Sequence, residues 1–203
     1  MENRTNKTVP LGSGRFYIVE HDGSALSAEK IVSACLAENQ FGETKGGATL
    51  SYTATEHKEK DDHGVLTRVI VTEEEAKLKG GIFSWMPEML TKLVRTGRVS
   101  DEDKYRVVKI GGLNNDDGKQ YIVVFKHIDP KYPPLYVAIV GTNSAGLQIA
   151  FARDNTSKLE PEFTALPGDE EGTLIFIVEE KVPEGKKVSE GEKVSEGVDQ
   201  VPA

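Results

Sequence analysis

Four histidines have the most versatile chemistry in this sequence, because imidazole can transfer protons and bind metals near neutral pH. His57 and His63 share one charged segment with Asp61 and Asp62, which supplies the donor types of a weak metal site. The four contain no His-x-x-x-His pair and no adjoining acidic ligand motif. A solvated loop is therefore the better interpretation of the segment. The histidines are His21, His57, His63 and His127.

Two glycine-containing segments match known ligand loops only in part. Gly12-Ser13-Gly14 is not followed by Lys-Ser/Thr or by a predicted helix, as a phosphate-binding loop requires. The segment 114–118 lacks the glutamate that a calcium loop carries six residues after its glycine, because Val124 stands there. We expect two ordinary turns, and no cofactor.

Cys35 is the only cysteine, which excludes an intrachain disulfide and a thiolate metal cluster and indicates synthesis in a reducing cytoplasm. A single cysteine on a helix face is most often a small buried side chain. The sequence has no nucleophile elbow, although triads assembled from distant residues leave no such local signature. We expect the protein not to be an enzyme.

Composition indicates one globular domain. The chain has 203 residues, of which 37% are hydrophobic and 29% charged, enough to bury a core and remain in solution. The net charge of -8 argues against tight binding of DNA, which depends on clustered Lys and Arg. Residues 1–10 are polar and no apolar stretch approaches the roughly 20 residues of a membrane helix, so we expect neither secretion nor membrane insertion.

Residues 11–180 show the pattern of a mainly β domain, with short alternating runs separated by Gly, Pro, Asn and Asp. Such regular spacing favours a β-sandwich or a barrel. The predicted strands are 14–20, 48–56, 66–79, 105–110, 120–127, 135–140, 147–153, 159–166 and 173–178.

The second and third of these strands form a long hairpin, with the charged connection 56–64 as its projecting tip. In the third strand Leu66, Ile70, Ala76 and Leu78 are expected to share a buried face. The opposite face is wet and carries Glu73, Glu75, Lys77 and Lys79.

Two segments have helical signals. Residues 87–95 begin with Pro87, have Glu88 in the first turn and Arg95 in the last, and precede Gly97, so we predict one α-helix flanking the sheet. Residues 27–38 have a plausible N-cap in Ser27 and are either a short helix or a loop.

The composition changes after Glu180. Three hexads of the form Lys-Val-x-Glu-Gly-x occupy 181–198 and contain no aromatic residue. Such a repeat cannot bury enough surface to become ordered. We therefore divide the chain into a flexible N-terminal segment (1–10), a β domain (11–180) and a disordered C-terminal tail (181–203).

Several segments resemble the tail tube proteins (major tail proteins) of long-tailed phages and prophages of Gram-positive bacteria. They are 46–52 (GGATLSY), 72–76 (TEEEA), 81–85 (GIFSW), 109–112 (KIGG) and 163–174 (FTALPGDEEGTL). The similarity spans about 11–180, and the order and spacing of the segments carry it. The segments 27–38 and 181–203 depart from the family pattern and inherit nothing from it.

The resemblance implies a β-sandwich or barrel-like fold with one flanking helix, assembled as hexameric rings that stack into a tube through which DNA passes without tight binding. It also implies tape measure, tail terminator and tail-tip proteins as partners, and the virion tail as the location of a protein made in the bacterial host cytoplasm. In that architecture the hairpin tip contacts neighbouring subunits. The candidate residues are Glu56, His57, Lys58, Glu59, Lys60, Asp61, Asp62 and His63.

Glu73 and Glu75 are candidates for an acidic lumen that repels DNA, although Lys77 and Lys79 on the same face favour the outer surface as much. Two other functions stay open from the sequence. A decoration or adhesion β-sandwich would not form rings, and a small-molecule-binding β-barrel would be monomeric and stabilised by its ligand.

Overall fold

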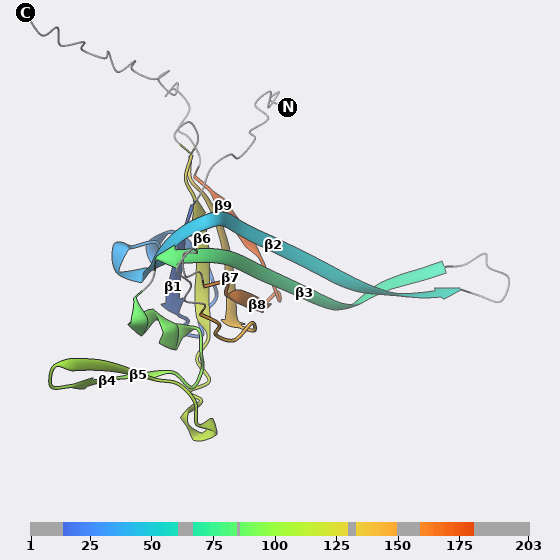
Figure 1. Cartoon of the computed structure of the whole chain (residues 1–203). Coiled ribbons are helices and arrows are strands. Elements are labelled where there is room, and N and C mark those ends of the chain that lie inside the picture. The colour runs from blue at the N-terminus through green and yellow to red at the C-terminus, as the bar shows by residue number, and fades with distance from the viewer. Residues whose placement is uncertain (1–13, 61–66, 85, 130–132, 150–158, 181–203) are drawn as a thin grey trace, which may run out of the picture.

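The computed structural model describes residues 14–180 apart from 61–66, 85, 130–132 and 150–158 (Figure 1). Residues 1–10 and 181–203 lie outside this part, so the division of the chain into three regions stays a prediction. The described part is mainly β, with a large antiparallel sheet and one α-helix. This confirms the expected fold class.

Six strands close into a barrel. Strand pairing runs β6-β1-β2-β3-β8-β7, and a further pairing of β6 with β7 closes the circle. β9 follows β8 along the same edge of β7, because β9 pairs with Leu135 to Ala138 and β8 with Val140 to Asn143. Closure leaves few unpaired strand edges in the core. The strands are β1 (Gly14–Glu20), β2 (Gln40–Lys60), β3 (Thr67–Ser84), β6 (Tyr121–His127), β7 (Leu135–Asn143), β8 (Glu162–Leu166) and β9 (Phe176–Glu179).

The barrel wall is buried on both faces along β6. Val123 and Phe125 belong to one apolar cluster with Phe16 of β1, while Ile122 and Val124 belong to a second. The second cluster lies under the helix α1 (Ala28–Ala34), which contributes Ile31 and Ala34. Burial on both faces explains why β6 reads as a continuous apolar run.

The segment 27–38, left open between helix and loop, forms α1 followed by the 3₁₀ turn η1 (Ala37–Asn39). Ser27 is the N-cap, and its Oγ accepts a hydrogen bond of 3.3 Å from the Lys30 backbone N–H. Cys35 ends the helix half-buried, and burial raises the pKa of its thiol to about 11.

The α-helix predicted over 87–95 is wrong. The segment forms the 3₁₀ helix η2 (Pro87–Lys92), in which Met89 N–H donates to the Met86 carbonyl at 2.9 Å. Six residues are too few for a cooperative α-helix, whereas 3₁₀ geometry is common in pieces of this length. Met89, Leu90 and Leu93 still pack into the first apolar cluster. Lys92 Nζ also donates to the Ile18 carbonyl at 3.0 Å, which ties η2 to β1.

One strand prediction is not confirmed, and one strand was not predicted. Residues 147–149 of the predicted strand 147–153 are not in a strand, and 150–153 lie outside the described residues. β4 (Arg98–Glu102) was missed because its sequence RVSDE is largely polar. It pairs with β5 (Tyr105–Lys109) as a separate two-stranded sheet.

Candidate assembly surfaces

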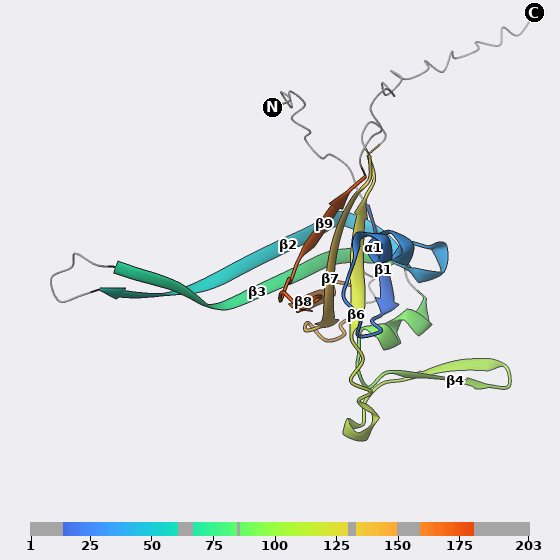
Figure 2. The same cartoon turned by 180° about the vertical axis from the view of Figure 1, so that it is seen from behind.

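The hairpin of β2 and β3 extends far out of the barrel (Figures 1 and 2). The strands have 21 and 18 residues, and β3 pairs with β8 only over Lys77 to Lys79. We call residues 51–60 and 67–75 the arm. Every side chain described at 51–60 and 68–75 is exposed. The arm is therefore a two-stranded ribbon with both faces uncovered in the single chain.

The arm is longer in strand than predicted. Residues 56–60 were expected in a connection but continue β2, with Glu56 opposite Val71 and Lys58 opposite Val69. Charged side chains suit a ribbon exposed on both faces, so the charge of this segment does not end the strand. Glu56, His57, Lys58, Glu59 and Lys60 thus form the outer part of β2, while Asp61, Asp62 and His63 lie outside the described residues.

The ion pairs near the end of the arm are local. Lys58 Nζ lies 3.4 Å from Glu56, and His57 Nε2 lies 3.4 Å from Glu59, each along one strand. Exposed pairs of this kind contribute about 0–1 kcal/mol. They can exchange for contacts with a neighbouring molecule at little cost.

A β-bulge at Thr72 determines which face of the arm carries Val69 and Val71. Thr55 pairs with Glu73 and Glu56 pairs with Val71, so Thr72 has no partner in the ladder. Its Oγ1 donates to the Thr55 carbonyl at 3.1 Å. One extra residue reverses the alternation. Val69 and Val71 therefore share a face with Ala76, and not with Glu73.

This face, the core-side face of the arm, continues the buried face of the barrel into solvent. Its apolar side chains Tyr52, Val69 and Val71 are 51%, 48% and 54% exposed. The charged side chains of Glu56, Lys58 and Glu74 lie between them on the same face. Ala76 and Leu78, further along β3, are buried as predicted. Ile70 was expected to join them but lies on the opposite face because of the bulge, and Leu66 lies outside the described residues.

The opposite face carries Glu73 and Glu75, as predicted. Lys77 Nζ lies 2.9 Å from Glu75 and 3.9 Å from Glu162, and Lys79 Nζ lies 3.8 Å from Glu160. The hydrogen bond to Glu75 raises the pKa of Lys77. Each lysine therefore has a neighbouring carboxylate from β8 or the residues before it. Among these side chains four carboxylates (Glu73, Glu75, Glu160 and Glu162) stand against two lysines, so their sum is negative. The position of this face in a lumen stays a prediction.

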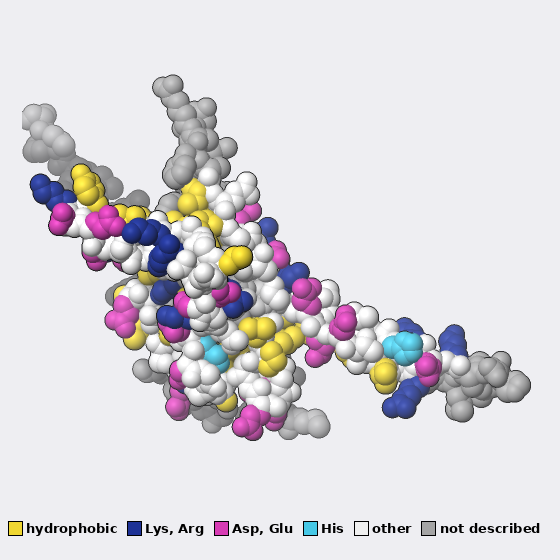
Figure 3. Space-filling view, turned by 90° about the horizontal axis from the view of Figure 1, so that it is seen from below, with side chains coloured by type: hydrophobic (Ala, Val, Ile, Leu, Met, Phe, Trp, Pro, Cys, Tyr) yellow, Lys and Arg dark blue, Asp and Glu magenta, His cyan; other side chains and the backbone are white. Residues whose placement is uncertain are grey.

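A groove lies between the base of the arm and the connection from β8 to β9. Its volume is about 370 Å³, and Tyr52, Glu74, Leu174 and Ile175 contribute to its lining with Glu171, Gly172 and Thr173. Tyr52 Oη donates to Glu74 Oε1, and this bond raises the pKa of the phenol. In Figure 3, seen from below, hydrophobic side chains gather where the arm leaves the barrel.

One wall of this groove is held by Asp169. Its Oδ1 accepts hydrogen bonds from Thr173 N–H at 2.8 Å and from Glu171 N–H at 3.1 Å, and the contacts with Thr173 are the main cause of its lowered pKa. The Gly168 N–H donates back to the Thr173 carbonyl at 2.9 Å. The connection is therefore shaped before any ligand arrives.

The hairpin of β4 and β5 projects in the opposite direction from the arm in both views (Figures 1 and 2). Arg106 pairs with Asp101 at 3.1 Å and also with Glu88 of η2, which fixes the hairpin against η2. Tyr105 at its tip is 73% exposed. The hairpin continues into the turn η3 (Leu113–Asn115), where Leu113 is 93% exposed. Sequence reasoning missed this surface because β4 was not recognised as a strand.

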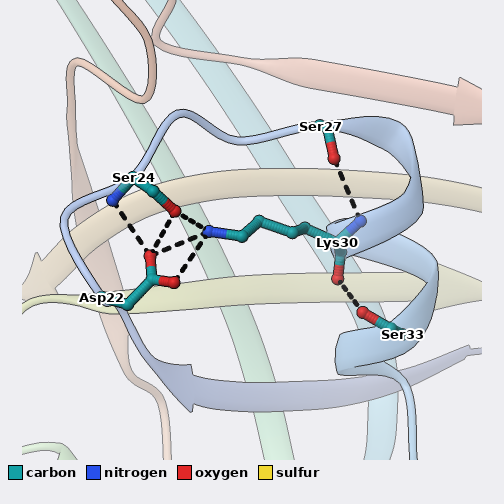
Figure 4. Close-up of polar contacts among 5 residues, drawn as sticks. All are labelled: Asp22, Ser24, Ser27, Lys30 and Ser33. Atoms are coloured by element: carbon teal, nitrogen blue, oxygen red, sulfur yellow. Dashed lines mark hydrogen bonds and ion pairs between the residues drawn. The ribbon is translucent and has the colours of Figure 1, made fainter.

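A polar cluster joins α1 to the turn after β1 (Figure 4). Lys30 Nζ donates to Asp22 Oδ1 at 2.8 Å and also contacts Ser24 Oγ. The contacts with Lys30 and Ser24 hold the pKa of Asp22 well below its ordinary value of 3.8. Lys30 is engaged by the carboxylate, so the cluster acts as a clamp on the helix.

The histidines are dispersed. His21 follows β1 near Tyr121, His127 lies at the far end of the β1–β6 pair, and His57 is in the arm. Within the described residues, no group of three or more His, Cys, Asp or Glu side chains could hold a metal ion. None of the described helices is both long and apolar enough to cross a bilayer.

Neither a protein-family model nor a curated protein matches the sequence. Among solved structures, a chain of the "Virion of native gene transfer agent (GTA) particle" is similar at 10% identity and a TM-score of 0.35. The alignment covers 80% of this chain and 95% of that chain. A similarity this distant carries no argument about function, so the function is argued below from the surfaces of the molecule.

Proposed function

We propose that the protein is a structural subunit of a phage-type virion tail, which assembles with copies of itself into stacked hexameric rings that form a tube for DNA. The observation that carries the proposal is the arm, whose core-side face carries Tyr52, Val69 and Val71 into solvent without a cover in the single chain. The resemblance of segments 46–52, 72–76 and 163–174 to tail tube proteins supports the choice of virion component.

The arm needs a partner on physical grounds. A two-stranded ribbon is marginally stable in water unless one face is covered. Tyr52, Val69 and Val71 are each about half exposed, so covering them stabilises the assembly by roughly 1 kcal/mol per side chain. A neighbouring subunit supplies such a cover and keeps the arm extended.

The shape of the chain favours rings over closed dimers. The arm and the β4–β5 hairpin project in opposite directions (Figure 1), so the surfaces that they offer are different. A contact between two different surfaces is heterologous, and repeated heterologous contacts close into rings or continue as filaments. Stacked rings use both the contact around the ring and the contact between rings.

The charge suits a conduit for DNA. The net charge is -8, and on the face with Glu73 and Glu75 these carboxylates, with Glu160 and Glu162, outnumber Lys77 and Lys79 four to two. Turned toward a lumen, this face repels the phosphate backbone over about 8 Å at physiological salt. Tape measure, terminator and tail-tip proteins as partners rest on the family resemblance alone.

The test compares V69S/V71S with I70S, which removes an exposed branched side chain from the opposite face of the same strand. Negative-stain electron microscopy and sedimentation over a concentration series should show hollow rings or tubes for the natural protein and for I70S. V69S/V71S should remain monomeric at concentrations where I70S assembles.

Two results would contradict the proposal. One is a natural protein that stays monomeric at high concentration, even with tail-tip complexes added as nuclei. The other is equal assembly of V69S/V71S and I70S, which would show that the core-side face is not a contact. A chain ending at Glu180 should assemble like the full chain if the hexads are dispensable.

A further inference from the structure

Leu113 is exposed to solvent on a turn whose neighbouring backbone carbonyls accept hydrogen bonds from Arg98 and Asn115. Its side chain is 93% exposed, the highest value among the large hydrophobic residues that the structure describes. It lies in η3, the small yellow-green turn at the bottom of Figure 1. Exposing a leucine this far costs solvation free energy in the single chain, which a partner would recover.

The turn around Leu113 is preorganised. Asn115 Nδ2 donates to the Gly111 and Gly112 carbonyls at 3.2 Å each. Arg98 Nη1 donates to the Gly111 carbonyl at 3.0 Å, which ties the turn to β4. Gly112 has a φ of 87°, which disfavours any residue with a side chain. Binding through such a turn loses little conformational entropy, so Leu113 has the properties of an interface anchor.

Arg95 holds the far side of this turn. Its Nε donates to Asp116 Oδ1 at 2.9 Å, and the same oxygen accepts from the Gly118 N–H at 2.9 Å. Leu113 is therefore an apolar tip on a base that is fixed by two guanidinium groups, those of Arg95 and Arg98.

The groove at the base of the arm is a suitable receptor for this tip. Tyr52, Leu174 and Ile175 contribute apolar atoms to a lining that is otherwise mostly polar, and Glu74 and Glu171 give it carboxylates. The groove has a volume of about 370 Å³, and one of its walls is a connection that Asp169 fixes. Its lining residues come from the base of the arm and from the β8–β9 connection, and the arm projects away from the β4–β5 hairpin (Figure 2).

The two regions differ in net charge, although most Lys and Arg near Leu113 are paired with carboxylates of their own region. Residues 159–180, which include one wall of the groove, contain seven Asp and Glu and no Lys or Arg. Residues 87–127, which include the Leu113 turn, contain eight Lys and Arg and six Asp and Glu. Attraction between the regions would orient two copies before contact.

The geometry points to a head-to-tail contact in which Leu113 of one copy occupies the groove between Tyr52 and Leu174 of the next copy. The occupant is a second copy because one chain carries both halves, and each copy can donate its turn and accept another. This inference rests on the proposed function and identifies one of the contacts that build the assembly.

The first test is directed disulfide formation in a C35S background. L113C and E171C proteins, mixed under mild oxidation, should give a covalent dimer that neither gives alone, and the L113C/E171C double variant should give a ladder of multimers. I177C replaces E171C as the control, since Ile177 is exposed on β9 and does not line the groove. A dimer of equal yield with I177C would overturn the contact.

The second test is L113D, with L36D as a matched control because Leu36 is also an exposed leucine. L113D should raise the concentration needed for assembly at least about tenfold, which corresponds to the loss of one anchoring contact. Its melting temperature should stay unchanged, since Leu113 contributes nothing to the core.

The outcomes separate this inference from the proposed function. If the natural protein assembles while L113D assembles equally well and L113C fails to cross-link with E171C, the contact is wrong and the proposed function stands. If L113D loses binding to another tail protein but not self-assembly, the occupant is that protein and the inference fails. If the natural protein never assembles, both fail.

Discussion

Gly80 lies where β3 passes over Phe16, and a methyl group at this position would lie 2.5 Å from Phe16 Cζ. Phe16 is 1% exposed and packs against Phe125 with 5.2 Å between the ring centroids, so its ring cannot move aside. We predict that G80A lowers the free energy of unfolding by about 1–3 kcal/mol. Chemical denaturation measures this loss.

A double-mutant cycle isolates the cause. F16L removes the ring atoms that the methyl would meet, so G80A should cost less in the F16L background than in the natural protein. Equal costs in both backgrounds would show that backbone conformation, and not the overlap with Phe16, explains the glycine.

At the clamp of α1, the lowered pKa of Asp22 makes stability depend on pH. A carboxyl whose pKa is lower in the folded chain stabilises the fold above its ordinary value of 3.8, and this contribution disappears as the pH falls through the folded pKa. D22N should therefore lower the melting temperature at pH 7, and the difference from the natural protein should shrink below about pH 4. K30Q should show the same pattern, and a pH-independent difference for both variants would contradict the clamp.

At the scale of the element, the bulge at Thr72 decides what the arm presents to a neighbour. Inserting one alanine between Thr55 and Glu56 should give Thr72 a partner in the ladder, restore simple alternation and move Val69 and Val71 to the face of Glu73. Because the arm is exposed, the melting temperature should change by only a few degrees, while assembly should be lost. Sedimentation of the insertion variant beside T72A, which keeps the bulge, measures the difference. Normal assembly of the insertion variant would show that the face of the arm is irrelevant.

The arm also predicts an independent core. Replacing residues 54–74 by Asn-Gly keeps the pair of Thr53 and Glu75 and closes the hairpin with a two-residue turn. The first apolar cluster stays complete, because its buried β3 residues Ala76, Leu78 and Ile82 are retained. We expect a folded monomer with cooperative unfolding by circular dichroism. An unfolded product would mean that the arm stabilises the barrel itself.

At the scale of the whole molecule, the acidic face should determine how assembled tubes treat DNA. Tubes of the natural protein should not retain a short fluorescent DNA duplex at physiological salt. E73K/E75K tubes should retain it, with binding that weakens steeply as salt rises. The E29K/E38K variant makes the same change of charge on the α1 side. If Glu73 and Glu75 line the lumen, E29K/E38K tubes should retain less DNA than E73K/E75K tubes. Equal retention would place Glu73 and Glu75 on the outer surface.

The sequence by itself determined the strand content, the existence of the long hairpin and the burial of Ala76 and Leu78, because alternation with a period of two is a local property of a strand with one buried face. It also indicated Ser27 as a possible N-cap, since capping depends on neighbouring residues. It did not determine the helix type at Pro87, which depends on how Met89 and Leu90 pack against the barrel.

Only the tertiary structure decided the register of the arm. The bulge at Thr72 reverses the alternation, and no residue type there announces it, so Ile70 was assigned to the wrong face. The groove was equally hidden, because Glu74 lies about 100 positions before Leu174 and Tyr52 still further away, and only the pairing of β3 with β8 brings these segments together. Local periodicity identifies strands, but the pairing of distant strands decides which faces remain uncovered.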